Sequence, residues 1–270
     1  MSAPAAFKAA VVQMVSTARV EENLAAAARL VARAAGQGAK LVVLPEYFCI
    51  LGMRDTDKVA AKEKDGAGPI QEFLAETARR HGVWLVGGSV PLACDDPGKV
   101  RNSCLVYDAN GRRVARYDKI HLFGLELGAE RFDEARTIEP GTESRAIDSP
   151  FGRIALSVCY DVRFPELYRA LAPIDVILVP SAFTATTGRA HWETLLRARA
   201  IENLAWVLAA AQGGKHPNGR RTHGHSMVVD PWGKVIAERA AGPGVVVAAI
   251  DPALQAKMRR SLPALAHRVL

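Results

Sequence analysis

The sequence predicts a protein of the α/β class, and two features of its pattern carry that prediction. Short apolar runs rich in valine, isoleucine and leucine alternate with longer stretches in which apolar residues recur at helical spacing. This alternation continues from Phe7 to about Ile250 and is typical of strand–helix–strand units. The 270 residues contain no Pro/Ser-rich linker, charge block or low-complexity tract. We therefore expect one domain over residues 1–270.

In the first half of the chain, strands and helices alternate up to a hairpin. We expect strands over residues 7–14, 40–44 and 83–87, and helices over residues 20–35 and 69–81. Two further expected strands, over residues 103–108 and 113–117, flank Asn110-Gly111, a dipeptide that favours a tight hairpin turn. Residues 118–145 show no clear period, so we expect a long irregular loop of the kind that is often functional.

The second half of the chain repeats the alternation. The expected strands are residues 154–158, 176–179, 206–211, 226–230 and 245–250, and the expected helices are residues 165–171 and 190–203. In the second of these helices Trp192, Leu195, Leu196 and Ile201 recur at helical spacing, which predicts one packed face rather than an aromatic ligand site.

Charge, hydropathy and cysteine usage exclude several other classes of protein. The 35 basic residues lie among 28 acidic ones with no basic run longer than two, so we expect no nucleic-acid partner. No apolar stretch approaches the roughly 20 residues that span a bilayer, and the N-terminus is a poor secretion signal. The four cysteines form no CxxC pair, and His223-Gly-His225 is a weak metal signal. We expect a cytoplasmic protein with no metal and no membrane association.

Three reactive residues each stand just after a short apolar run. They are Glu46 in LPE, Lys119 in YDKIH and Cys159 in SVCYD. A carboxylate, an ammonium and a thiol supply a base, a cation and a nucleophile, which is a complete set for acyl transfer through a thioester. Taken singly, each has an ordinary structural interpretation as a paired glutamate, a surface lysine or a small buried cysteine.

The local setting of each residue suits such chemistry. Cys159 is expected where a strand turns into a helix, which aims backbone N–H groups, including that of Tyr160, at the bound group. Partial burial of Glu46 would raise its pKa towards neutrality, as a general base requires. Lys119 could stabilise an oxyanion and hold Cys159 as a thiolate.

Together these motifs resemble the three motif regions of the nitrilase or carbon-nitrogen hydrolase superfamily. They are LPE, YDKIH and VCYDVRFPE, in this order and at these intervals, and the resemblance covers nearly the whole chain. It implies a four-layer α-β-β-α sandwich and a homodimer or larger assembly of dimers. It also implies that Glu46 is the base, Lys119 the oxyanion partner and Cys159 the nucleophile, with no metal or organic cofactor.

Later motifs look like the Nit branch of that superfamily. They are PSAF, HWE, RARAIEN and GHSMVVDPWG, at residues 180–183, 191–193, 197–203 and 224–233. The Nit branch contains the deaminated-glutathione amidases and the ω-amidases, and the run RARAIE with VVDPWG is closer to the former. The resemblance thus implies hydrolysis of a non-peptide C–N bond in a small amide that carries a carboxylate.

The resemblance also implies a second glutamate in the loop after the lysine, which orients the lysine and the substrate. The segment Phe132-Asp133-Glu134 is similar to the one that holds it, so Glu134 is assigned. Glu126 and Glu130 are alternatives in the same loop. The segments 123–131 and 50–65 depart from the family pattern, which leaves the identity of the substrate open.

Substrate recognition and two rival functions complete the interpretation. Arg163, four residues after Cys159, is expected to bind a distal carboxylate of the substrate by a bidentate pair; the alternative is a structural ion pair with Glu166 or Asp161. One rival is a true nitrilase or an N-carbamoyl amidohydrolase, although nitrilases typically show Cys-Trp-Glu where this chain has Cys159-Tyr160-Asp161. The other rival is an inactive binding or assembly module, which the presence of all three reactive residues disfavours.

Overall fold

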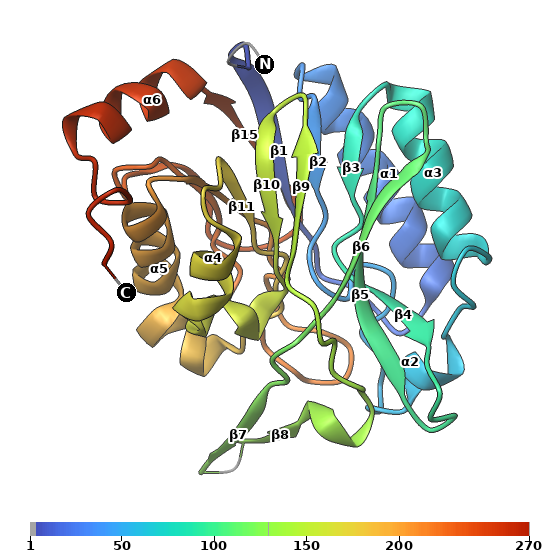
Figure 1. Ribbon diagram of the computed structural model, residues 1–270. Helices are drawn as coiled ribbons and strands as arrows, with labels where there is room; N and C mark the ends of the chain where they lie inside the picture. Colours follow the sequence, from blue (N-terminus) through green and yellow to red (C-terminus); the bar gives the residue numbers. More distant parts are fainter. Residues whose placement is uncertain (1–3, 129, 270) are drawn as a thin grey trace.

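The computed structural model describes residues 4–128 and 130–269, and two facing β-sheets form its centre (Figure 1). The helices α1 (Val20–Gly36) and α3 (Pro69–His81) cover the outer face of the first sheet. The helices α4 (Pro165–Leu171) and α5 (Ala185–Asn203) cover the outer side of the second. The expected four-layer α-β-β-α sandwich is confirmed.

Within the described residues the first sheet has seven strands, in the spatial order β15-β1-β2-β3-β5-β4, with β6 paired to β5. The bounds are β1 (Phe7–Gln13), β2 (Leu41–Val43), β3 (Trp84–Val86), β4 (Val90–Ala93), β5 (Val100–Tyr107), β6 (Arg113–Asp118) and β15 (Gly244–Ile250). Side chains alternate between the two faces of each strand. Val11 and Val43 therefore pack in the core between the sheets, whereas Val12 and Val42 pack in the core beneath α1 and α3.

The second sheet has six strands in the described residues, in the order β14-β13-β12-β11-β10-β9. They are β9 (Arg145–Ser149), β10 (Gly152–Leu156), β11 (Val176–Leu178), β12 (Trp206–Ala209), β13 (Ser226–Val229) and β14 (Val235–Arg239). Both sheets contain three neighbouring parallel strands, β1-β2-β3 in the first and β10-β11-β12 in the second. In open α/β sheets, ligands bind beyond the carboxyl ends of such strands, and β2 and β10 are the strands that lead to Glu46 and Cys159.

The element pattern was predicted well where apolar periodicity is strong. The helices α3 and α4 have the expected bounds, and α5 begins five residues earlier than expected, with the side chain of Thr184 as its N-cap. Trp192 and Leu196 are buried as expected, but Ile201 is 47% exposed, so the prediction of one packed face was wrong at that position. Among the described residues, no helix has both the length and the hydropathy needed to cross a bilayer.

The segment expected to be an irregular loop holds a hairpin, β7 (Gly124–Leu127) and β8 (Glu130–Asp133), followed by the 3₁₀ turn η1 (Glu134–Arg136). The hairpin projects from the sandwich (Figure 1). Its strands are only four residues long and largely exposed, and the apolar Leu127 is exposed as well, so the apolar residues do not mark a buried face. The sequence pattern also missed β4, β9, β14, the short α2 (Asp57–Ala60) and α6 (Pro252–Ser261).

Candidate active site

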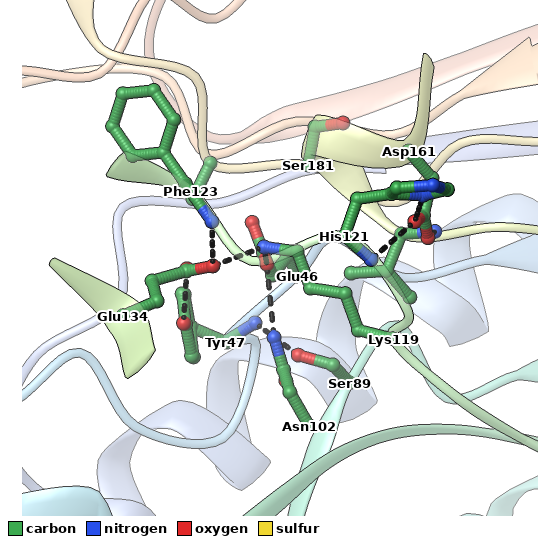
Figure 2. A network of polar contacts seen from close by, with 12 residues as sticks. Glu46, Tyr47, Ser89, Asn102, Lys119, His121, Phe123, Glu134, Asp161 and Ser181 are labelled. Atoms are coloured by element: carbon green, nitrogen blue, oxygen red, sulfur yellow. Dashed lines mark hydrogen bonds and ion pairs between the residues drawn. The ribbon is translucent and has the colours of Figure 1, made fainter. Parts of the chain in front are cut away.

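Lys119 is completely buried and lies between two carboxylates (Figure 2). Its Nζ is 3.0 Å from Oε1 of Glu46 and 2.7 Å from Oε2 of Glu134. Glu46 is also buried, with 1% of its surface exposed. Because one ammonium faces two carboxylates, the cluster carries a net negative charge when all three groups are ionised. Of the three loop glutamates considered, Glu134 is the one that contacts Lys119.

Glu46 reaches the site because it follows the buried strand β2. Neighbouring segments hold both its carboxylate and the backbone of the turn in which it lies. Oε1 accepts a 3.0 Å hydrogen bond from Nδ2 of Asn102, on β5, in addition to the one from Lys119. Tyr47, directly after it, has a positive φ of 54°. Gly88 lies so close to this turn that a Cβ atom there would come within 2.0 Å of the carbonyl oxygen of Pro45. The backbone around Glu46 is thus fixed by close packing.

Glu134 is brought back to Lys119 by the β7-β8 hairpin. The chain leaves near Phe123 and returns at Glu134, and the two residues bind each other twice: the N–H of Glu134 donates to the Phe123 carbonyl at 3.0 Å, and the N–H of Phe123 donates to Oε2 of Glu134 at 2.8 Å. The phenol of Tyr47 donates to Oε1 of Glu134 at 2.8 Å. The Glu134 carboxylate is therefore held by three donors, one of them Lys119 (Figure 2).

Cys159 is the first residue of the 3₁₀ turn η2 (Cys159–Arg163) and is 7% exposed. Its φ is 53°, which is uncommon for a residue other than glycine and characteristic of side chains held at functional sites. Its backbone N–H donates to the carbonyl of Pro180 at 2.8 Å. The Cys159 side chain lines one narrow cavity together with Glu46, Glu134 and Ala182. The structure thus joins Glu46, Lys119, Glu134 and Cys159 in one cluster.

The surroundings push the pKa values of the two carboxylates in opposite directions. Burial raises the pKa of Glu46, and the charge of Glu134 raises it further against the opposing effect of Lys119. Burial would also raise the pKa of Glu134, but Lys119 and the hydrogen bonds from Phe123 and Tyr47 outweigh it, so this pKa is lowered. Such a divergence assigns separate roles: Glu134 stays ionised, and Glu46 can take up and return a proton.

The thiol and the ammonium both keep their protons in the resting site. Burial raises the pKa of Cys159, and the Glu46 carboxylate adds to the rise. Burial by itself would lower the pKa of Lys119, but Glu134 and Glu46 together hold it above its usual value. The expectation that Lys119 holds Cys159 as a free thiolate therefore does not describe the resting site, because burial and the carboxylates outweigh the ammonium.

Cys159 opens into a narrow cavity, which we name the inner cavity. Among the residues that line it are Glu46, Glu134, Tyr160 and Arg220. A wider cavity of about 490 Å³, named here the outer cavity, is lined by the residues 50–55, the hairpin strand β8 and the loop 218–221. The two cavities share Phe123, Glu134, Thr184 and Arg220 in their linings. Together they provide a small reactive chamber and a roomier space beside it.

The two residues expected to bind substrate are placed differently. Tyr160 lines the inner cavity, whereas Arg163 is not part of the described lining of either cavity. The Arg163 guanidinium lies 5.6 Å from the ring centre of Tyr160 and 5.5 Å from that of Phe183, and its Nη2 is 3.2 Å from Nδ1 of His191. The alternative ion pair with Glu166 or Asp161 does not form among the described residues.

Three site residues were not anticipated from the sequence. Asn102 binds Glu46 from the middle of a strand, where no motif marks it. Asp161 was considered only as a partner of Arg163, yet it is fully buried and joins the Lys119 and Cys159 segments. Arg220 was considered only as part of a short basic run. Since each acts through a contact between distant segments, only the folded structure could identify it.

Comparison with known proteins identifies a matching family and several relatives. The profile of the family described as carbon-nitrogen hydrolase matches residues 8–260. A deaminated glutathione amidase of Synechocystis sp. is 41% identical over 269 residues, which is 97% of this chain and 98% of the relative. The solved NitFhit protein of Caenorhabditis elegans is 40% identical, with a TM-score of 0.90, and covers 99% of this chain. This chain spans 66% of that one.

A more distant solved structure is that of an amidase with a modified cysteine. An amidase from Nesterenkonia sp. AN1, in the form of a glutamate-to-glutamine mutant, is 28% identical with a TM-score of 0.79. The match covers 94% of this chain and 99% of that one. That structure shows the result of Michael addition of acrylamide at the active-site cysteine of the amidase.

Proposed function

Because this chain belongs to the carbon-nitrogen hydrolase family, we propose that it hydrolyses the non-peptide amide bond of a small substrate that carries carboxylates, as a deaminated glutathione amidase. One observation carries this proposal: Cys159 lines a narrow cavity together with a buried Glu46, which is ion-paired with Lys119. The 41% identity with the Synechocystis amidase supports the choice of substrate. We propose that residues 1–270 act as a single hydrolase domain.

In the acylation step, Glu46 accepts the proton of the Cys159 thiol as the sulfur attacks the carbonyl carbon of the amide. The C=O π electrons move onto the oxygen, where the ammonium of Lys119 and the backbone N–H of Tyr160 stabilise the negative charge. Glu46 then gives its proton to the amide nitrogen as the C–N bond breaks. The products of this step are a free amine and a thioester at Cys159.

In the deacylation step, a water molecule loses a proton to Glu46 and attacks the thioester carbonyl. The second oxyanion is stabilised at the same place, and it collapses with release of the sulfur, which recovers a proton from Glu46. Glu134 takes no proton in either step, because its lowered pKa keeps it ionised. Its role is to hold Lys119 in position and protonated.

Neither step calls for a metal or an organic cofactor, since Glu46 accepts and returns every proton and Lys119 faces each developing negative charge.

We propose that Arg163 acts on the substrate through its charge and does not form a bidentate pair with it. Its charge favours a carboxylate on the acyl half of the substrate across the rings of Tyr160 and Phe183.

Assembly and compartment belong to the same proposal. We propose a homodimer, or a larger assembly of dimers, that uses the exposed face of α5. Ile201 on this helix is 47% exposed, and the nearby Trp232 is 57% exposed. Large exposed apolar side chains favour a protein interface when they gather on one face. The four cysteines are free, and we propose a reducing, cytoplasmic compartment.

The experiment that tests the function is an assay of the purified enzyme against a panel of substrates. The panel comprises deaminated glutathione, α-ketoglutaramate, a neutral amide of equal length, an N-carbamoyl amino acid and an aliphatic nitrile. We expect the highest kcat/KM for deaminated glutathione. Faster turnover of the neutral amide or the nitrile than of both anionic amides would contradict the proposed substrate. Turnover that persists in Cys159→Ala would contradict the proposed mechanism.

A further inference from the structure

The outer cavity carries three positive charges that no carboxylate in the described part of the chain neutralises by an ion pair. They belong to Arg220, Lys58 and Arg221, of which Arg221 is exposed and the other two are partly buried. Other cations in its lining are already paired: Arg54 with Asp57, and Arg131 with a glutamate of the hairpin. A partly buried cation without an anionic partner is costly unless a ligand supplies the anion.

Arg220 is fixed in place between the two cavities. Its Nη2 donates to the carbonyl of Ala182 at 3.0 Å, and its guanidinium lies 5.0 Å from the ring centre of Phe132. Its Nε is buried and has no hydrogen-bond partner in the described residues. Ala182, Arg220 and Cys159 all line the inner cavity. The guanidinium therefore stands close to the nucleophile, with donor capacity to spare.

Lys58, on the short helix α2, adds a further positive charge to the lining of the outer cavity. Its Nζ donates to the backbone carbonyl of Asp55 at 2.8 Å and lies 6.0 Å from the ring centre of Tyr47. Burial lowers the pKa of Lys58; the charges of Asp55 and Glu134 oppose this effect, and the charge of Arg220 adds to it. The two cations thus act on one region of the cavity, where a bound anion would relieve both burial and mutual repulsion.

The order of the two chemical steps at Cys159 indicates which half of the substrate occupies this region. After acylation the acyl half stays bound to the sulfur in the inner cavity, while the amine half must leave and water must enter. The outer cavity is the larger space and adjoins the inner one through Phe123, Glu134, Thr184 and Arg220. The amine half is therefore the part of the substrate that lies in the outer cavity and departs from it.

We propose that Arg220 and Lys58 form a binding site for a carboxylate on the amine half of the substrate. This inference rests on the proposed function and deepens it. The non-peptide amide of deaminated glutathione joins an oxo-dicarboxylate to a dipeptide that ends in a carboxylate. The corresponding primary amide, α-ketoglutaramate, has the same acyl group but releases only ammonia. The site would select amides of carboxylate-bearing amines over primary amides.

The test compares these two substrates, which form the same acyl-enzyme. In Arg220→Gln, loss of a charge-assisted pair should lower kcat/KM for deaminated glutathione by about tenfold to hundredfold, with a smaller loss in Lys58→Gln. The kcat/KM for α-ketoglutaramate and the rate constant of deacylation should stay within about threefold of wild type. Arg220→Lys should recover part of the loss. Arg260→Gln, an equal charge change at an exposed residue of α6 that is absent from the described lining of both cavities, is the matched control.

A third substrate isolates the carboxylate itself. The C-terminal carboxamide of deaminated glutathione should be a poorer substrate than the acid for wild type, and Arg220→Gln should lose that preference. Equal losses on all substrates in Arg220→Gln, or an unchanged preference for the acid, would overturn this inference and leave the proposed function intact. A wild-type enzyme that hydrolyses neither deaminated glutathione nor α-ketoglutaramate would overturn both.

Discussion

The side chain of Asp161 accepts a 2.7 Å hydrogen bond from the phenol of Tyr117. Tyr117 stands two residues before Lys119, and Asp161 stands two residues after Cys159. The bond therefore ties the segment with the cation to the segment with the thiol. The carboxylate also accepts bonds from two backbone N–H groups, one in each segment. The distance between Lys119 and Cys159 thus depends on a buried carboxylate that has no part in the proposed chemistry.

We predict that Asp161→Asn destabilises the protein and slows acylation. An amide keeps one acceptor oxygen and turns an NH₂ group towards the donors, which costs about 2–3 kcal/mol and lowers Tm by about 5–10 °C. Tyr117→Phe removes only one of the donors and should cost about 1 kcal/mol. Thermal denaturation and single-turnover kinetics measure both effects. A wild-type Tm in Asp161→Asn would show that the link does not hold the two segments together.

For Glu46→Gln, activity and stability should change in opposite directions. Loss of the general base should lower the rate of acylation at least about a hundredfold. Because the pKa of Glu46 is raised in the folded state, its contribution to stability is present below the unfolded pKa and is lost as pH rises through the folded pKa. Glutamine does not ionise, so the variant does not lose stability as the pH rises. The variant should therefore be the more stable form at pH 8, by about 2–4 °C, with the difference vanishing near pH 4.

The same pKa shift determines the acid limb of the pH profile. Since Glu46 must be ionised to accept the thiol proton, kcat/KM should rise with pH around a midpoint above the ordinary glutamate pKa of about 4.3. The charge of Glu134 contributes to the raised pKa of Glu46. Glu134→Gln should therefore move the acid limb to lower pH, and should reduce the rate less than Glu46→Gln does. In Glu126→Gln, an exposed position on the hairpin, the limb should stay in place. A limb that moves to higher pH in Glu134→Gln would contradict this coupling.

The sequence was sufficient for the parts of this protein that depend on local pattern. The helices α3 and α4 show strong apolar periodicity, and the sequence around Cys159 reads directly as a strand that turns into a helix. The position of Glu134 could not be derived in the same way. It depends on a short, largely exposed hairpin in which apolar residues do not mark a buried face, so motif similarity alone separated Glu134 from Glu126 and Glu130.

Recognition of the substrate was the part least accessible from the sequence. Arg163 stands close to the nucleophile along the chain, but the rings of Tyr160 and Phe183 lie against its guanidinium. Arg220 stands 61 positions after Cys159, and it reaches the cavity through the packing of the loop 218–221 against β8. Proximity in sequence is a weak guide to such contacts, because loops from different elements meet only after the two sheets have packed.

The central claim, a thioester at Cys159, is tested most directly by mass spectrometry of enzyme quenched rapidly during turnover of a slow amide substrate. We predict that the acyl mass appears on the peptide that contains Cys159 and that hydroxylamine traps the acyl group. The other three cysteines are internal controls: Cys49 and Cys104 are fully buried, with the pKa of Cys104 raised to about 12 by burial, and Cys94 lies away from the cluster. The acyl mass on any of these three, or turnover without a trappable acyl group, would contradict the account.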